Sequence, residues 1–165
     1  MNAASRPGVL LRAAGIGAAA GVVGAGAMVV GEKAEQALSH RPNSYVPARA
    51  LLTLLGRHPG DDDRPSGWNF LMHYGTGAAL GALRGIWSVT GIRGAHANAW
   101  HTVVRLAVDQ TVENTTGVGA PPASWPKEEL AVDVLHKAVY SLLTGVLADR
   151  LLAPVLASAR GRTSH

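Results

Sequence analysis

The chain has 165 residues and a formal net charge of +4, and only 16% of its residues are charged, so it has room for one domain with few ionic groups. Its basic residues are scattered and do not alternate with aromatic residues, which argues against a nucleic-acid surface. The absence of cysteine excludes disulfides, a thiolate nucleophile and cysteine-ligated metals.

An uncharged segment near the N-terminus predicts the first membrane helix. Residues 13–31 contain no polar side chain, and about 20 apolar residues at 1.5 Å each cross a hydrocarbon core. The short stretch 1–12 before it is a polar lead. Two alternatives remain open: a signal peptide cleaved after Ala25-Gly26-Ala27, and the buried helix of a soluble protein.

The next part of the chain predicts a turn, a short helix and a loop. Residues 39–46 contain Pro42 and form the turn, and Pro47 suits the first turn of a short amphipathic helix over 48–55. Residues 57–67 combine glycine and proline with three aspartates, which is typical of a solvated loop.

Three further helices are predicted, over 68–89, 95–113 and 126–152, with a stiff proline-rich connector at 119–126. The chain is therefore expected to be all-α, a membrane helical bundle of three or four apolar helices plus the short amphipathic one. Residues 13–156 form its single domain, and 157–165 form a polar tail. Whether 95–113 crosses the membrane stays open, because this helix carries several charged residues.

Glycines repeat along one face of two of these helices. Small residues at four-residue spacing are typical of membrane helices whose backbones approach closely. Because each glycine costs about 1 kcal/mol in a helix relative to alanine, their repetition indicates a packing role. The predicted packing residues are Gly17, Gly21, Gly24, Gly77, Gly81 and Gly85.

Ionisable residues also recur on single helix faces, and such groups at membrane depth normally face the bundle interior or water. The predicted polar interior or binding residues are His73, Arg84, His101, Asp109, Asp133 and His136. Arg84 is always charged, so we expect it to pair with Asp109 or Asp133. Lys137, Asp149 and Arg150 lie closer to helix ends and are expected to extend toward lipid headgroups.

No catalytic residue, cofactor or metal site is predicted, and the chain is not expected to be an enzyme. Asp133 and His136 have the spacing used by carboxylate-bridged metal bundles, but the motif occurs only once. The sequence has no phosphate-binding loop after a strand and no nucleophile elbow.

Three sequence elements carry a resemblance to a known family. They are the Gly-Ala-Ala-Ala-Gly-Val-Val segment leading to Glu32, the glycine-rich helix of His73, and Pro-Pro-Ala-Ser-Trp-Pro at 121–126 followed by Glu129, Asp133 and His136. With them the chain resembles the YagU-like family of small bacterial inner-membrane proteins of unknown function, over residues 14–152. The resemblance implies a helical fold and a location in the inner membrane, and no particular chemistry.

These observations lead to three expectations about function. The first is a small multi-pass protein of the cell membrane with a structural or regulatory role exerted through helix packing. Its partners would be the lipid bilayer and, as an open alternative, further copies of itself. The second is a small transporter or proton-linked channel with a polar bundle interior, and the third is a soluble helical binding module.

Overall fold

The computed structural model describes residues 5–156, and all regular secondary structure in that range is helical. The elements are α1 (Arg6–Ser39), α2 (Val46–Leu54), α3 (Ser66–Thr90), α4 (Gly94–Thr115), the 3-10 turn η1 (Pro122–Ser124) and α5 (Lys127–Leu151). The expected all-α fold, with four long helices and one short helix, is confirmed. The polar tail 157–165 lies outside the described residues.

The helix bounds follow from local chemistry. The Ser5 hydroxyl accepts a hydrogen bond from the amide of Gly8, which caps α1 seven residues before the apolar run begins. Gly91, with φ of 93°, ends α3 in the left-handed conformation that favours glycine. Pro126 precedes α5, whose first turn carries Glu128 and Glu129. The ranges expected for α2 to α5 agree within two residues at each end.

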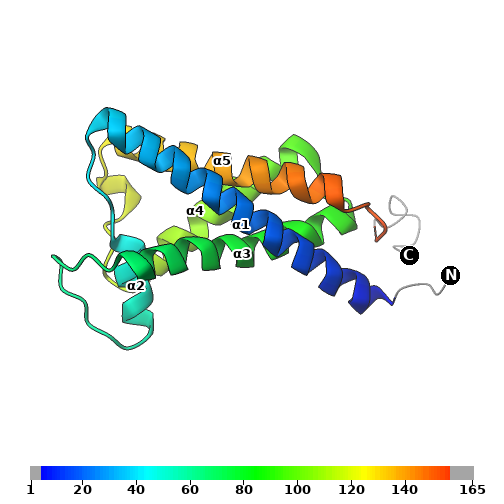
Figure 1. Cartoon of the computed structure of the whole chain (residues 1–165), viewed down its shortest axis with the longest axis horizontal. Helices are drawn as coiled ribbons and strands as arrows, with labels where there is room; N and C mark the ends of the chain where they lie inside the picture. The colour runs from blue at the N-terminus through cyan, green and yellow to red at the C-terminus, as the bar shows by residue number, and fades with distance from the viewer. Residues whose placement is uncertain (1–4, 157–165) are drawn as a thin grey trace.

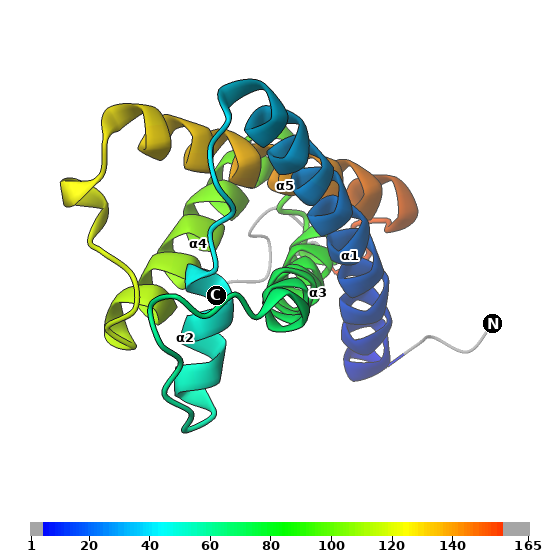
Figure 2. The same cartoon turned by 60° about the vertical axis from the view of Figure 1, so that its left-hand side comes forward.

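The four long helices lie alongside one another (Figure 1). Helices α3 and α5 run in one direction, and α1 and α4 run in the other (Figures 1 and 2). Helix α1 packs mainly on α3 and α5, and α4 packs mainly on α5. We call the end that carries α2, η1 and the long loops the loop end, and the end where α1 begins and α5 finishes the terminal end.

Glycines bring the backbones of α1 and α3 into direct contact. A methyl group at Gly21 would lie 2.8 Å from the Cα atom of Gly81, and one at Gly85 would lie 2.9 Å from the Cα atom of Gly17. Neither neighbour has a side chain that can move aside, so any larger residue would push the helices apart. Gly24 instead faces α5, where a methyl group would lie 2.9 Å from the Tyr140 carbonyl oxygen.

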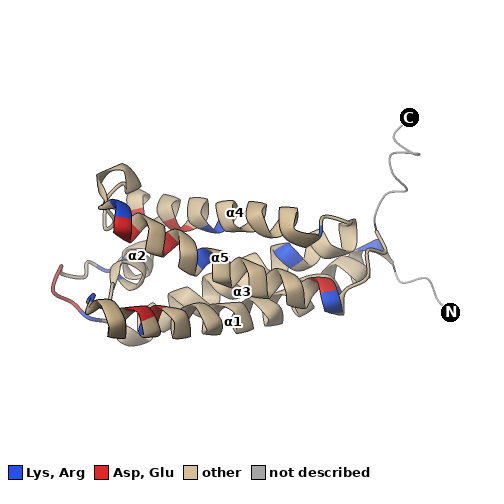
Figure 3. Ribbon diagram, turned by 90° about the horizontal axis from the view of Figure 1, so that it is seen from above, with Lys and Arg blue, Asp and Glu red and all other residues tan. Residues whose placement is uncertain are grey.

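The interior contains several charged and polar side chains beside its apolar ones, and many large apolar side chains are exposed, a combination unusual for a soluble protein. The largest fully buried side chains include Arg84, Arg105, His101 and Tyr140. The outer surface instead carries many large aliphatic side chains, and Figure 3 shows few charges along the middle of α1. Examples of exposed residues are Val22, Val23, Val30, Leu135, Leu142 and Leu151.

Among the described helices, α1 and α5 are long and apolar enough to cross a membrane, judged by length and composition only. The prediction of a span within 13–31 agrees with this for α1. Composition does not select α3, which was also expected to cross. Helix α3 is long enough, but His73 and Arg84 reduce its apolarity, and α4 is more polar still.

Candidate polar pocket at the loop end

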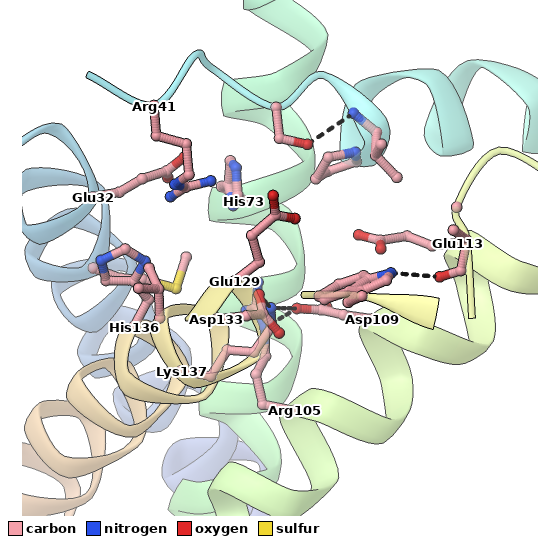
Figure 4. A pocket seen from close by; sticks show the side chains of 18 of the residues that line it. Glu32, Arg41, His73, Arg105, Asp109, Glu113, Glu129, Asp133, His136 and Lys137 are labelled. Atoms are coloured by element: carbon pink, nitrogen blue, oxygen red, sulfur yellow. Dashed lines mark hydrogen bonds and ion pairs between the residues drawn. The ribbon is translucent and has the colours of Figure 1, made fainter. Parts of the chain in front are cut away.

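A pocket of about 440 Å³ opens at the loop end of the bundle (Figure 4). All four long helices contribute to it, and the segments before α2 and around η1 complete its wall. Its ionisable lining residues are Glu32, Arg41, His73, Arg105, Asp109, Glu113, Glu129, Asp133, His136 and Lys137. Its apolar lining includes Met28, Val46, Met72, Trp125 and Val132.

Helical spacing explains why these groups meet. Arg105, Asp109 and Glu113 follow one another at four-residue intervals, so they lie on one face of α4. On α5, Asp133 and Lys137 have the same spacing. Because α4 runs toward the loop end and α5 starts there, both polar faces meet at the same height.

Two acids and two bases between α4 and α5 form an ionic network. The Arg105 Nε atom donates to Asp109 Oδ2 at 2.8 Å, and Lys137 Nζ lies 3.7 Å from the same oxygen. Lys137 also donates to Asp133. The Arg105 guanidinium carbon lies 4.9 Å from the centroid of the Tyr140 ring. These contacts balance the two positive charges with two negative ones.

A second ion pair closes the pocket from the side of α1. Arg41, in the loop after α1, donates to Glu35 with an N–O distance of 2.7 Å. The hydrogen bond to Glu35 raises the pKa of the Arg41 guanidinium above its usual value. The charge of Arg41 is therefore matched by a residue outside the pocket lining.

Glu113 differs from the other buried acids because it lacks a protein partner. The residue is 9% exposed, and its carboxylate, which reaches the open volume of the pocket, makes no hydrogen bond or ion pair within residues 5–156. Figure 4 shows this carboxylate pointing into the pocket. The Gly119 amide donates to the Glu113 carbonyl at 3.0 Å, which ties the connector to this part of α4.

The structure brings together four of the six predicted polar-interior residues: His73, Asp109, Asp133 and His136 all line the pocket. His101 lies farther along the bundle, fully buried. Its Nε2 atom is 3.1 Å from the Leu80 carbonyl oxygen, and its ring stacks on Tyr140 with 5.4 Å between centroids.

Arg84 lies outside the pocket, and its predicted pairing with Asp109 or Asp133 is wrong. It forms a two-pronged ion pair with Asp149, at 3.0 and 2.8 Å, and donates to Asn98 at 3.0 Å. The reason is the direction of the helices. Helices α3 and α5 run in the same direction (Figure 1). Arg84 lies in the last third of α3 and therefore meets Asp149 near the end of α5.

The same register corrects the expectation that Lys137 and Asp149 extend outward. Asp149 accepts hydrogen bonds from Ser88 at 2.7 Å and from the Gly94 amide at 2.9 Å, so it joins α3, α4 and α5. Lys137 is buried in the pocket network. Arg150 alone of the three is exposed, as expected.

The predicted site residues left out six of the ionisable pocket residues and the tryptophan of the pocket wall. These are Glu32, Arg41, Arg105, Glu113, Glu129, Lys137 and Trp125. Glu113 was recognisable, because it continues the four-residue spacing of His101, Arg105 and Asp109 on one face of α4. Arg41 lies in a loop and Trp125 follows η1, and no periodic pattern places a loop residue against a helix.

The pocket lining contains no site suited to a single metal ion. Among residues 5–156, no three histidine, aspartate or glutamate side chains are grouped so that they could hold one ion. The arrangement is instead that of a cavity with charged groups on several separate walls.

Comparison with known proteins returned no matching family model, no matching curated protein and no matching solved structure. The resemblance to the YagU-like family therefore stays a prediction.

Proposed function

We propose that the chain is a multi-pass protein of the cell membrane that binds a small polar solute in the loop-end pocket. The observation that carries this proposal is the distribution of polar and apolar side chains. Charged side chains are buried inside the bundle and line a pocket, whereas many aliphatic side chains lie on the outer surface.

The membrane part of the proposal rests on the large apolar side chains that the bundle exposes, because contact of such surface with water is unfavourable. Large exposed apolar patches mark an interaction site with lipid or protein. Here most of the exposed large apolar side chains lie on the outer faces of α1 and α5, the two helices whose composition suits a membrane, and others lie on α3 and α4, such as Phe70 and Val103. In a bilayer these faces contact lipid tails, and the buried ion pairs of α3 and α4 are shielded from them.

The membrane part is tested by alkaline carbonate washing of membranes that contain the full-length protein. We expect the protein to remain in the pellet. Release into the supernatant would instead support the alternative of a soluble helical binding module.

The binding part rests on the volume and chemistry of the pocket. A cavity of about 440 Å³ falls within the range of about 300–1,000 Å³ typical of small-molecule sites. Its walls combine apolar side chains with ten ionisable residues from all four long helices and the loop after α1, so the pocket is more polar than most small-molecule sites and suits a charged solute.

Binding is tested by filling the pocket. Val132→Trp places a large side chain in the lining, and Leu135→Trp is the matched control on the exposed face of α5. In a thermal-stability screen against amines, amino acids, carboxylic acids and sugars, at least one solute should stabilise the wild type and the control but not Val132→Trp. A screen without such a solute would contradict the proposal.

A second candidate, transport of a solute or proton, is favoured by the buried polar side chains that continue beyond the pocket. From the pocket, Arg105, His101 and Asn98 follow the inner face of α4 toward Arg84 at the terminal end. Flux measurements in sealed vesicles separate this candidate from simple binding. The structural or regulatory role expected from the glycine contacts stays a prediction.

A further inference from the structure

The charges that line the pocket do not balance. Asp109 and Asp133 are matched by Arg105 and Lys137, and Arg41 is matched by Glu35. Three carboxylates in the lining then remain without an ion-pair partner within residues 5–156. They are Glu32 on α1, Glu113 on α4 and Glu129 on α5.

Among these three carboxylates, that of Glu113 reaches the open volume of the pocket from a buried residue and receives no donor from residues 5–156. A partly desolvated carboxylate is stabilised by a cationic partner. The side chain of Glu113 is nine-tenths buried and aimed into the open volume (Figure 4). Gly119 packs closely on it, since a methyl group there would lie 2.8 Å from the Glu113 Cβ atom. The connector thus helps to hold this orientation.

The three carboxylates stand on three different helices, so one small ion does not satisfy them together. No three acidic or histidine side chains of the described chain are grouped closely enough to hold a metal ion. A ligand that neutralises more than one of these carboxylates must therefore carry separate positive charges on an extended frame.

The apolar side chains of the pocket wall suit the carbon chain between the charged groups of such a ligand. Met28, Met72 and Trp125 provide apolar and aromatic surface between the carboxylates. The Trp125 Nε1 atom donates to the Ala120 carbonyl at 2.9 Å, which fixes the indole at the pocket wall. Methylene groups pack well on such surfaces, and an ammonium group is attracted to an aromatic face.

From these observations we infer that the pocket binds a linear aliphatic diamine or polyamine, with its amino groups on Glu113 and at least one of Glu32 and Glu129. This inference rests on the proposed function, because it names the class of solute that the pocket takes.

The test is isothermal titration calorimetry of the purified full-length protein in detergent with 1,4-diaminobutane. Butylamine, 1,4-butanediol and Mg²⁺ serve as comparison ligands that lack the second charge, both charges or the carbon chain. The diamine should bind more tightly than each of them. Glu113→Gln should weaken diamine binding by about tenfold, the loss expected for one charge-assisted hydrogen bond, and at least one of Glu32→Gln and Glu129→Gln should do the same. Glu128→Gln, on the exposed side of α5, should leave it unchanged.

The inference is overturned if the diamine binds no more tightly than butylamine, if Glu113→Gln retains wild-type affinity, or if Glu32→Gln and Glu129→Gln both retain it. If another solute then stabilises the wild type and fails to stabilise Val132→Trp, the proposed function stands and only the ligand class is wrong. If no solute binds at all, both proposals are wrong.

Discussion

At the residue scale, the ion pair of Arg84 and Asp149 joins α3 to α5 through two hydrogen bonds. Arg84 is fully buried, and its side chain bonds Ser88 and Asn98 as well as Asp149. Gly145 is required beside it, because a methyl group there would lie 2.7 Å from the Asn98 Cγ atom and 3.0 Å from the Arg84 Nε atom. Because Arg84 is fully buried, water cannot solvate its charge when a partner is removed.

Asp149→Leu should therefore destabilise the protein by about 3–5 kcal/mol, because it leaves Arg84 charged and unpaired in the interior. The double variant Arg84→Leu with Asp149→Leu should recover a large part of this loss. Chemical unfolding in detergent measures both values. Arg84→Leu with Asp133→Leu is the control and should show no recovery, since those two side chains are not in contact. Equal losses in the two double variants would contradict the pairing.

At the scale of elements, the glycine contact of α1 and α3 can be tested with two substitutions on α3, one expected to lower the stability of the protein and one expected to raise it. Gly81→Ala should destabilise, because its methyl group would lie 2.6 Å from the Gly21 Cα atom. Gly75→Ala should stabilise by about 0.5–1 kcal/mol, because its methyl group meets no atom within 4 Å and alanine favours the helix. Thermal unfolding in detergent compares the two. Stabilisation by both substitutions would show that α1 and α3 do not touch at Gly81.

The sequence was informative about elements and much less so about their register. Proline and glycine marked the helix ends, and glycine spacing identified the packing faces, because both depend on local backbone chemistry. The polar faces of α4 and α5 were also recognisable from spacing. The partner of Arg84 was not, because it depends on which helices run in the same direction. Arg41 was not predicted because it lies in a loop, and a loop has no periodic pattern from which contacts with a helix can be inferred.

At the scale of the whole molecule, the structure places the start of α1 and the end of α5 together. Ala13, Val89 and Leu152 pack as one cluster at the terminal end, and the Leu156 amide donates to the Val89 carbonyl at 2.8 Å. If the bundle crosses the membrane, both termini must lie on the same side. Reporter fusions at the two ends should give the same signal, and opposite signals would contradict this topology.

The central claim is that the apolar outer faces of the bundle contact lipid, and α4 tests it best because its composition alone does not identify it as a span. The chain has no native cysteine, so single cysteines can be introduced without background labelling. Val103 is half exposed on the outer face of α4, and Asp62 lies in the loop between α2 and α3.

The measurement is the reaction of Val103→Cys and Asp62→Cys with a charged maleimide in opened membrane vesicles. The account predicts that Asp62→Cys reacts at once and that Val103→Cys reacts only after denaturation in detergent. Equal reaction of both cysteines in native membranes would show that the outer face of α4 contacts water and would contradict the account.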